Sequence, residues 1–517
     1  MSWDSLDAAA AQGMSIAYIA APHPERIAIL SERGSRSYAE LNTRVNQLAR
    51  SLRAAGLERG DGVALVSPNC IEFAEVFFAT QRCGLRLTPV SWHLTPEEIA
   101  YIVADSRARA LVIHARLAET AGPAGSAPDL VLKLSIGGAL PGFGDFETAL
   151  ADQDGDDIDG PSLGDVMLYT SGTTGRPKGV RRALPDPERA VLGYKLLVAA
   201  FDFRAGEHDI TLATGPLYHS GPINLCLSIP VNNGIPTFLM EKWDAEKMLR
   251  LIEEHQVTHT FCVPTMFRRL LSLPEATRKS YDVSKLRFII HGAAPTPVED
   301  KRAIIEWFGP IVTEIYAATE GMGSLVTSKE WLAHPGSVGR PSPDNIRILG
   351  EDGSPVPAGE TGTVYLLPAG GGDFEYQGDR EKTAAAKRDG FFSVGDRGYL
   401  DDDGYLFLTG RSAELILSGG TNVYPAEIDE VILAHPQVRD AAAVGVDDDE
   451  WGEVVKAVVV PEPGADADAA LASSILEHCR KRLATIKMPR SVDFTDEIPR
   501  SEAGKLLRRR LRDRYRS

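Results

Sequence analysis

Short apolar runs alternate with amphipathic runs through the first third of the chain. The apolar run from Gly62 (GVALVSPN) predicts a buried strand, and the next segment (CIEFAEVFFATQRCG) predicts a helix with Phe73 and Phe77 on one face. The same rhythm returns in RLTPV, TPEEIAYIVADS and ALVIHA, where Thr95 and Pro96 are residue types that begin a helix. Strand–helix–strand alternation predicts an α/β fold with parallel-rich sheets and flanking helices.

The pattern changes near Arg411. Before it, GDRGYLDDDGYLFLTGR alternates glycine, acidic and aromatic residues like a hairpin, and after it PAEIDEVILAHP and LASSILEHCRKRLA predict helices beside the strands AAAVGV and VVKAVVV. We therefore predict a large domain over residues 1–411 and a small α+β domain over residues 412–517. A last helix would place Leu507, Leu511 and Tyr515 on one stripe and its arginines elsewhere.

Two stretches have unusual charge. Residues 210–240 contain no Asp, Glu, Lys or Arg, but glycines and prolines interrupt them repeatedly, which predicts several short buried elements and not a membrane-spanning helix. The acidic run DQDGDDIDG, from Asp152 to Gly160, predicts a solvated loop that leads into a strand, DVMLYTS.

Composition narrows the class of protein. Of the 517 residues, 43% are hydrophobic and 25% are charged, which allows a large buried core. A net charge of -17 argues against nucleic-acid binding, because phosphate contacts need a basic surface. The five cysteines are scattered without a CxxC pair, and the N-terminus (MSWDSLDAAAAQG) lacks the basic and apolar regions of a secretory signal. These features predict a cytoplasmic protein without a disulfide framework or zinc site.

The stretch LYTSGTTGRPKGV predicts a phosphate-binding loop. Its glycines let backbone N–H groups turn toward an anion, Ser171 and the threonines add hydroxyl donors, and Lys178 adds a positive charge. The Walker A pattern does not fit, because its second glycine would fall on Pro177 and Lys178 is followed by Gly179. A nucleoside triphosphatase of the Ras or kinase type is therefore disfavoured.

The segment YTSGTTGRPKG resembles the phosphate loop of the adenylate-forming superfamily, which includes acyl-CoA synthetases, peptide-synthetase adenylation domains and firefly luciferase. The motifs HGAAPTP, IYAATEG, SVGDRGYL, LTGR and PRSEAGK follow in the family's order over nearly the whole chain, which is most similar to a free-standing acyl-CoA synthetase. The resemblance implies a large domain with a distorted barrel-like part and a small, mobile C-terminal domain. It also implies that the loop clamps the β- and γ-phosphates of ATP through Thr170, Ser171, Gly172, Thr173, Thr174, Gly175 and Lys178.

The later motifs complete the expected nucleotide site. The small side chains of Gly292, Ala293 and Ala294 leave room for a flat ring against the backbone, although Ala317 stands where the family usually has glycine. The resemblance assigns Mg²⁺ to Thr170 and Glu320, oxygen ligands of the kind this cation prefers. It further assigns base stacking to Tyr316, phosphate contact to Thr319, and ribose binding to Asp396 with Arg411.

The expected catalytic residues are Lys505, His219, Glu320 and Thr170. An ammonium such as that of Lys505 is charged at neutral pH and would offset repulsion between a carboxylate and the α-phosphate. His219 resembles the family's gate between the acyl pocket and the thiol channel. The uncharged residues after it form either an apolar acyl wall or plain core: Ile223, Leu225, Cys226, Leu227 and Ile229.

The implied reaction has two steps and uses ATP, Mg²⁺ and coenzyme A. A hydrophobic acid, medium-chain, long-chain or ring-bearing, gives acyl-AMP and pyrophosphate, and a thiol then releases AMP. The resemblance implies that the small domain rotates about a hinge after Arg411 between the two steps. Ala413 stands there in place of the family's usual Asp or Lys, which predicts that this rotation is altered. Gly419 and Gly420 are expected to face the pantetheine channel.

Two alternatives stay open. One is an acyl-AMP ligase that loads a carrier protein, and the other is a non-catalytic sensor of acyl-adenylate or coenzyme A. The expected partners are a small carboxylic acid, ATP and coenzyme A, without nucleic acid or a transmembrane segment. The sequence leaves both the acid and the oligomeric state open, with a homodimer among the alternatives.

Overall fold

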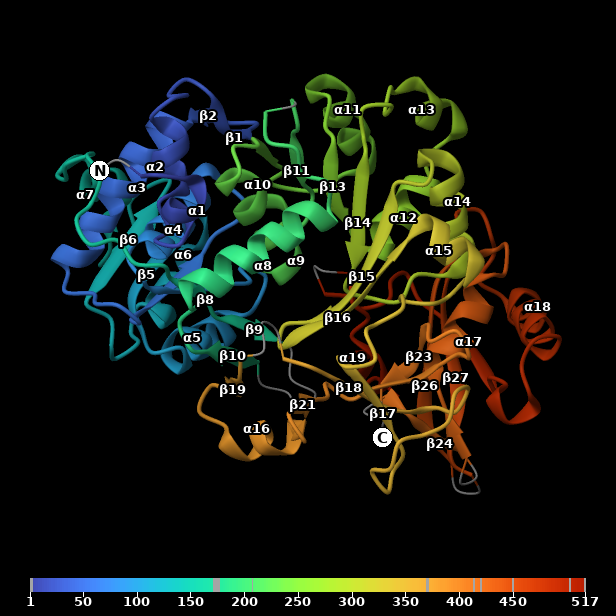
Figure 1. Ribbon diagram of the computed structural model, residues 1–517. Helices are drawn as coiled ribbons and strands as arrows, with labels where there is room; N and C mark the ends of the chain where they lie inside the picture. The colour runs from blue at the N-terminus through green and yellow to red at the C-terminus, as the bar shows by residue number, and fades with distance from the viewer. Residues whose placement is uncertain are drawn as a thin grey trace.

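The computed structural model describes residues 3–170, 177–206, 208–368, 372–411, 414–418, 421–448, 451–501 and 504–515. These residues form a mixed α/β protein in which a large body, blue to orange in Figure 1, carries a smaller C-terminal domain, orange to red, on one side. The predicted fold class is confirmed. The predicted boundary between residues 411 and 412 stays a prediction, since residues 412 and 413 lie outside the described part.

The first sheet is the one that the alternating N-terminal pattern predicts. Its six strands run in the order β7-β6-β5-β3-β4-β8, where β7 is Gly144–Asp145 and β6 is Leu132–Ile136, and every pairing is parallel. The helix after Thr95 begins as expected, because the Thr95 hydroxyl accepts a hydrogen bond from the backbone N–H of Glu98 at 3.3 Å. The main elements are β3 (Gly62–Val66), α4 (Ile71–Arg82), β4 (Arg86–Val90), α5 (Pro96–Asp105) and β5 (Ala108–His114).

The second sheet has eight strands and lies at the centre of the molecule (Figure 1). Its inner strands are parallel, so the carboxyl ends of β13, β14 and β15 meet at one edge. In sheets of this kind, ligands bind at the carboxyl ends of the strands. These strands and their neighbours are β11 (Thr211–Ala213), β12 (Thr237–Leu239), β13 (His259–Cys262), β14 (Phe288–Gly292), β15 (Val312–Ala318) and β16 (Gly321–Thr327).

The uncharged stretch forms short buried elements, as predicted. Between β11 and β12 it makes two brief helical segments, α9 (Ser220–Pro222) and α10 (Ile229–Asn232), joined by a π-helix over Ile223–Ser228. In the part of the chain that the structure describes, no helix is both long and apolar enough to cross a membrane.

Two smaller sheets cover the carboxyl edge of the eight-stranded sheet. The predicted strand DVMLYTS is divided at Met167, because β8 (Asp165–Val166) joins the first sheet whereas β9 (Leu168–Thr170) joins a three-stranded sheet. This three-stranded sheet is completed by β10 (Lys178–Arg182) and β19 (Phe374–Tyr376). The predicted hairpin before Arg411 is confirmed as β22 (Asp396–Leu400) and β23 (Leu406–Arg411).

The C-terminal domain contains the predicted helices and strands around its own core. The strands AAAVGV and VVKAVVV form the antiparallel pair β26 and β27. The last helix, α19 (Arg508–Arg512), spans five residues, and Arg508 is buried in it, contrary to the expectation that the arginines lie off the buried stripe. The other main elements are β24 (Ile416–Ser418), α17 (Pro425–Leu433), β26 (Val438–Asp448), β27 (Gly452–Pro461), α18 (Ala469–Arg480) and β28 (Ser491–Phe494).

The acidic run from Asp152 to Gly160 is a solvent-exposed loop, as predicted, and its main chain is also bound to a helix. Donors on the helix α3 (Tyr38–Ala54) bind its backbone carbonyls: Asn46 Nδ2 donates to Gly155 O at 2.9 Å, and Arg53 Nη2 donates to Gly160 O at 2.9 Å. The loop is therefore fixed to α3 by hydrogen bonds to its main chain, which its acidic side chains do not reveal.

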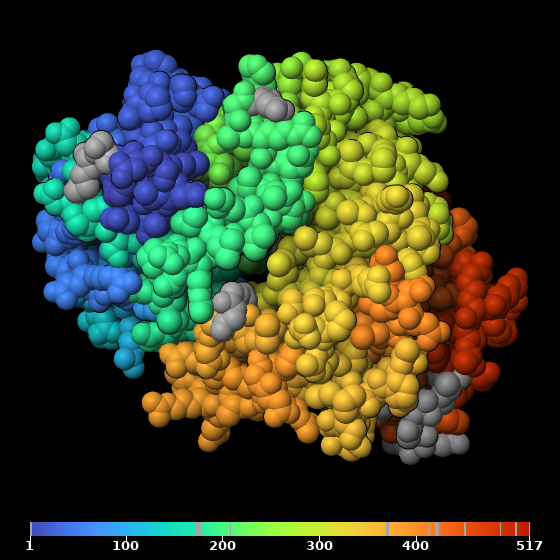
Figure 2. All heavy atoms as spheres, in the orientation of Figure 1, coloured from blue at the N-terminus to red at the C-terminus, as the bar shows by residue number. Residues whose placement is uncertain are grey.

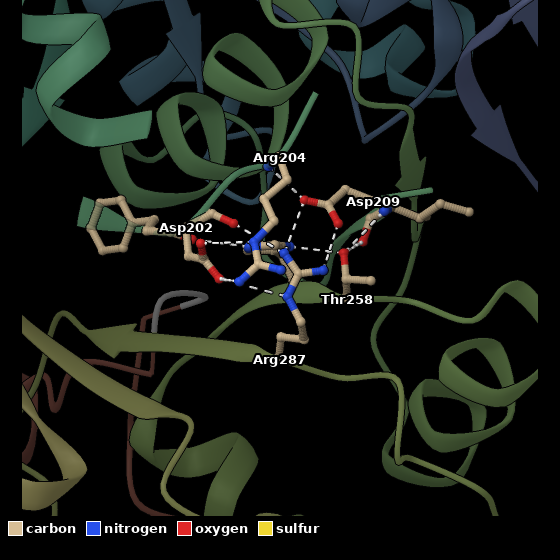
Figure 3. Close-up of polar contacts among 8 residues, drawn as sticks. Asp202, Arg204, Asp209, Thr258 and Arg287 are labelled. Carbon is tan, nitrogen blue, oxygen red and sulfur yellow. Dashed lines mark hydrogen bonds and ion pairs between the residues drawn. The ribbon is translucent and has the colours of Figure 1, made fainter. Parts of the chain in front are cut away.

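A buried ionic cluster fixes the segment between α8 (Pro187–Ala200) and β11 to the start of β14 (Figure 3). Arg287 donates to both carboxylate oxygens of Asp209, at 2.6 and 3.1 Å, and the Asp209 side chain has no exposed surface. The carboxylate of Asp209 also accepts from the Arg204 backbone N–H at 2.7 Å, and the Arg204 guanidinium pairs with Asp202 at 2.8 Å. Removing the Arg287 guanidinium would leave a buried carboxylate without its bidentate partner.

We predict that Arg287→Ala lowers the free energy of unfolding by about 3–5 kcal/mol, because a buried charge then loses its partner. Urea denaturation followed by circular dichroism measures the change. The matched control is Lys279→Ala, which breaks an ion pair with Glu275 whose two side chains are 75% and 68% exposed, and which should cost at most about 0.5 kcal/mol. Equal losses in the two variants would contradict the stabilising role of the cluster.

Candidate active site

A cleft lies where the large body meets the C-terminal domain. Two adjoining cavities of about 1910 and 2210 Å³ open there, and both are lined by Ala293, Arg411 and Lys505. In Figure 2 the surface is hollowed where the green, yellow and orange segments meet. Residues from strands far apart in the sequence, and from both domains, therefore face one cleft.

Small residues line the cleft at the end of β14. Gly292, Ala293 and Ala294 line the second cavity together with Tyr316 of β15. A Cβ atom on Gly292 would lie 2.5 Å from the Ile315 carbonyl oxygen, so only glycine lets the two strand ends approach this closely. Ala293 has a φ of 73°, a left-handed conformation that is uncommon for alanine. That a flat ring lies against these residues stays a prediction.

Asp396 connects two of the predicted nucleotide residues. Arg411 is its neighbour across the β22–β23 hairpin and donates from Nε to Asp396 Oδ1 at 2.8 Å. The Tyr316 hydroxyl donates to Asp396 Oδ2 at 2.8 Å, and burial with the nearby carboxylate raises the pKa of this hydroxyl. Tyr316 is thus held by a hydrogen bond at its tip, which a stacking role alone does not require.

A second group gathers around the turn between β15 and β16. Thr170 and Lys178 are neighbours across β9 and β10, and both line the first cavity with Thr319 and Glu320. Burial, followed by the nearby Lys382, lowers the pKa of Lys178. The structure therefore brings the strand ends of the phosphate loop to the same cleft as the IYAATEG motif.

Two side chains that sequence reasoning missed hold this turn. The Tyr376 hydroxyl donates to Glu320 Oε1 at 2.8 Å, and the Arg182 guanidinium donates to the backbone carbonyl of Thr319. Arg182 shares a strand face with Lys178, because it lies four residues further along β10, so alternation along the strand was a usable signal. Tyr376 lies nearly 200 residues further along the chain, and no local pattern marks it.

Part of the prediction falls outside the described residues. These are the phosphate-loop residues Ser171, Gly172, Thr173, Thr174 and Gly175, the hinge residue Ala413, and the glycines Gly419 and Gly420.

Lys505 reaches the cleft from the C-terminal domain. Burial, followed by the charge of Arg411, lowers the pKa of Lys505 to about 8, against the opposing carboxylates of Glu414, Asp396 and Glu320. Gly504, beside it, has a φ of 71°, and a Cβ atom there would lie 2.5 Å from the Thr265 hydroxyl of the large body. A glycine is needed at this position both for the turn and for close packing of the two domains.

Arg508 is a further residue that the sequence did not indicate. It is buried, and it donates to Asp429 Oδ2 at 2.6 Å and to Glu414 at 3.2 Å. Glu414 comes directly after the predicted hinge, so Arg508 ties the first described residue of the small domain to α19.

His219 lines the first cavity, and its Nε2 atom is buried without a hydrogen-bond partner among the described residues. Burial lowers the pKa of His219 to about 4, so the imidazole is neutral at pH 7. Of the five apolar residues considered as a wall, Leu225 lines the cavity. The other four lie in the core: Ile223, Cys226, Leu227 and Ile229.

Further apolar residues of the first cavity come from β13 and the helix after it. Phe261 and Met266 line the cavity opposite the uncharged stretch, whose Tyr218 and Pro222 also contribute. Sequence reasoning missed Phe261 and Met266, because their segment carries no motif.

Curated relatives match almost the whole chain. It is 34% identical over 485 residues to a feruloyl-CoA synthase of Amycolatopsis, covering 93% of this chain and 94% of the relative. It is 32% identical over 496 residues to the long-chain-fatty-acid–CoA ligase FadD13 of Mycobacterium tuberculosis, covering 93% of each chain. Among solved structures, an anthranilate CoA ligase, AuaEII, in complex with anthranoyl-AMP superposes with a TM-score of 0.86 at 25% identity, covering 98% of this chain and 97% of that one.

Family models match both parts of the chain. The model of the AMP-binding enzyme covers residues 17–369, and the model of the AMP-binding enzyme C-terminal domain covers residues 427–505. Together with the cleft between the domains and the relatives above, these matches show that the chain belongs to the family of AMP-binding enzymes, the adenylate-forming enzymes that include the acyl-CoA synthetases.

Proposed function

We propose that this enzyme joins a hydrophobic carboxylic acid to coenzyme A, through an acyl-AMP intermediate, with release of pyrophosphate and then AMP. The observation that carries the proposal is the position of Lys505. Its ammonium comes from the small domain, yet it is buried in the cleft, where the charges of Arg411, Asp396 and Glu320 of the large body act on it after burial itself. A cation at this place can act on a nucleotide held by the body.

The residues around the cleft support a site for ATP. An adenine ring would lie against the backbone at Gly292 and Ala294, beside Tyr316. Asp396, beside Arg411, can accept hydrogen bonds from both ribose hydroxyls. Lys178 and Thr319 face the cavity where the phosphates would follow. Enzymes of this family that form CoA thioesters use ATP, Mg²⁺ and coenzyme A.

The oxygen atoms in this part of the cleft suit Mg²⁺. Glu320 Oε1 accepts from Tyr376, whereas Oε2 has no hydrogen bond among the described residues, and the Thr170 hydroxyl lies at the cavity wall. Carboxylate and hydroxyl oxygens are ligands that this hard cation prefers. Bound there, Mg²⁺ would neutralise phosphate charge, with Glu320 and Thr170 as its protein ligands.

Lys505 would stabilise the first step. The acid's carboxylate attacks the α-phosphorus, a new C–O–P bond forms, and the bond to the leaving pyrophosphate breaks. Both reactants carry negative charge, so a fixed ammonium between them lowers their repulsion and stabilises charge that develops on the α-phosphate. A low-dielectric site strengthens this effect relative to water.

The second step takes place at the acyl carbon and not at the α-phosphorus, so it needs a different arrangement. The thiol attacks the acyl carbon and AMP leaves, which requires Lys505 to withdraw so that a thiol can approach. Rotation of the small domain about residues 412 and 413 would achieve this, with Arg508 keeping Glu414 attached to the moving part. The neutral imidazole of His219 at the cavity wall can border the thiol path without placing a charge beside the acyl group.

The acyl part of the cleft supports a hydrophobic substrate. Leu225, Phe261 and Met266 offer apolar surface, and an amino acid's ammonium would find no neutralising group among these three side chains. The named relatives act on feruloyl and long-chain fatty acyl groups, both largely apolar.

A panel of acids tests the proposed function. Purified enzyme with ATP, Mg²⁺ and coenzyme A is offered fatty acids, aromatic acids and polar amino acids, and pyrophosphate release and thioester are measured separately. We expect both products with at least one class of hydrophobic acid and neither with amino acids. Pyrophosphate without CoA thioester would contradict coenzyme A as the acceptor, and no ATP consumption with any acid would contradict the enzymatic role.

For Lys505→Ala we predict loss of acyl-AMP formation by about 100-fold or more, since one preorganised charge contributes about 3 kcal/mol to a step of this kind. Thioester formation from supplied acyl-AMP should stay within a few-fold of wild type, because the amine acts only in the first step. Rapid-quench measurement of each half-reaction separates the two effects. Equal loss in both would show that Lys505 is not specific to adenylation.

The lowered pKa of Lys505 predicts an alkaline limit. The protonated amine is the active form, so kcat/KM for ATP in the adenylation step should fall as pH rises through about 8. The alkaline fall of kcat should occur at higher pH than that of kcat/KM, because bound phosphates favour the charged amine. Lys505→Arg keeps its charge at all these pH values, so its kcat/KM profile should lack this fall, whatever its absolute rate. A fall that persists in Lys505→Arg would assign it to another group.

A further inference from the structure

Four side chains share one face of the small sheet β19-β10-β9. Lys178, Val180 and Arg182 alternate along β10 and therefore project to the same side. Tyr376 of β19 is the direct partner of Val180 in the antiparallel register, so it lies on this side too. The face carries two cations and a tyrosine toward the cleft, where all three line the first cavity.

Tyr376 makes two contacts that connect separate parts of the site. Its hydroxyl donates to Glu320 Oε1 at 2.8 Å, and the ammonium of Lys178 lies 4.8 Å from the centre of its ring. Tyr376 is 7% exposed and Glu320 is 4% exposed, so both groups are largely removed from water. Arg182 on the same face fixes the adjoining peptide through the carbonyl of Thr319.

We propose that Tyr376 is a positioning residue of the adenylation step, which orients the Glu320 carboxylate for Mg²⁺ and supports the Lys178 ammonium at the phosphates. The inference rests on the proposed function in one respect, that Glu320 is a ligand of Mg²⁺. The hydroxyl occupies Oε1, and Oε2 is left as the carboxylate oxygen without a hydrogen bond among the described residues. The carboxylate is thereby fixed with one oxygen available to a cation.

The energetic effect follows from what each contact does. A carboxylate that loses its hydrogen-bond donor regains rotational freedom and must be reoriented when the metal binds. Outer-shell partners of metal ligands typically change metal affinity by about 10–100-fold when they are removed. The ring contact is smaller, since a cation over an aromatic face contributes about 0.5–1 kcal/mol at partly exposed sites, or about 2- to 5-fold in affinity.

Two substitutions separate these contributions. Tyr376→Phe removes the hydroxyl but keeps the ring under Lys178, and Tyr376→Leu removes both. The control is Tyr281→Phe, which deletes a similar hydroxyl whose bond to Glu246 Oε1, at 3.0 Å, lies on the surface. Mn²⁺ replaces Mg²⁺ as a spectroscopic probe, and its binding to each enzyme with α,β-methylene-ATP is followed by electron paramagnetic resonance.

We expect Tyr376→Phe to weaken Mn²⁺ binding by about 10-fold or more while the affinity for metal-free nucleotide stays near wild type. Tyr376→Leu should show the same loss for Mn²⁺ and also bind metal-free nucleotide about 2- to 5-fold more weakly. Tyr281→Phe should match wild type in both measurements. Thermal unfolding of each variant identifies a loss of folding; should Tyr376→Leu fail to fold, Tyr376→Phe alone decides the metal effect.

The inference is overturned if Tyr376→Phe binds Mn²⁺ as tightly as wild type, or if Tyr281→Phe loses as much. That result would leave the proposed function standing, because wild-type enzyme would still bind the metal–nucleotide complex. If wild type itself bound neither Mn²⁺ nor nucleotide, the proposed function would fail, and the positioning role would fail with it.

Discussion

The placement of one ammonium group beside the nucleotide cleft constrains the rest of this structure. Lys505 is partly withdrawn from water, and Arg411 adds a like charge nearby, so both effects favour its neutral form. The carboxylates of Glu414, Asp396 and Glu320 oppose them. The pKa of Lys505 is therefore about 8, and phosphate charge in the same place would favour the protonated form of the amine. This balance needs groups from both domains to meet within one cleft.

Close backbone approach makes that meeting geometrically feasible. Gly504 lets the Lys505 turn pack against Thr265 of the large body, and Gly292 lets the ends of β14 and β15 come together. In each case a single methyl group would collide with its neighbour at about 2.5 Å. The positions of the Lys505 amine and of the ends of β14 and β15 thus depend on two residues that have no side chain.

The small sheets around the cleft connect elements that line the same cleft. The strand ends of the phosphate loop, the turn after β15 and the β22–β23 hairpin are distant in sequence, and they are joined through Tyr376, Arg182 and the Asp396–Arg411 pair. Hydrogen bonds to charged groups, such as those to Glu320 and Asp396, are among the stronger ones in proteins. The site is consequently a network of mutually oriented groups, in which a change at one strand alters the geometry at another.

Local sequence determined much of the fold and of the site. Apolar periodicity marked the strands and helices around Gly62 and Thr95, because a buried face follows directly from side-chain alternation. The motif residues Lys178, Glu320, Asp396 and Lys505 meet in one cleft, as their order in the chain led us to expect. Tertiary structure alone decided which neighbours complete them. No motif marks the segments that contain Tyr376, Phe261 and Arg508. The acidic loop is fixed through its backbone carbonyls. In the uncharged stretch, Leu225 faces the cavity, whereas most of its apolar neighbours lie in the core. The physical reason is that periodicity shows whether a side chain is buried, whereas its partner is set by how separate strands pack in space.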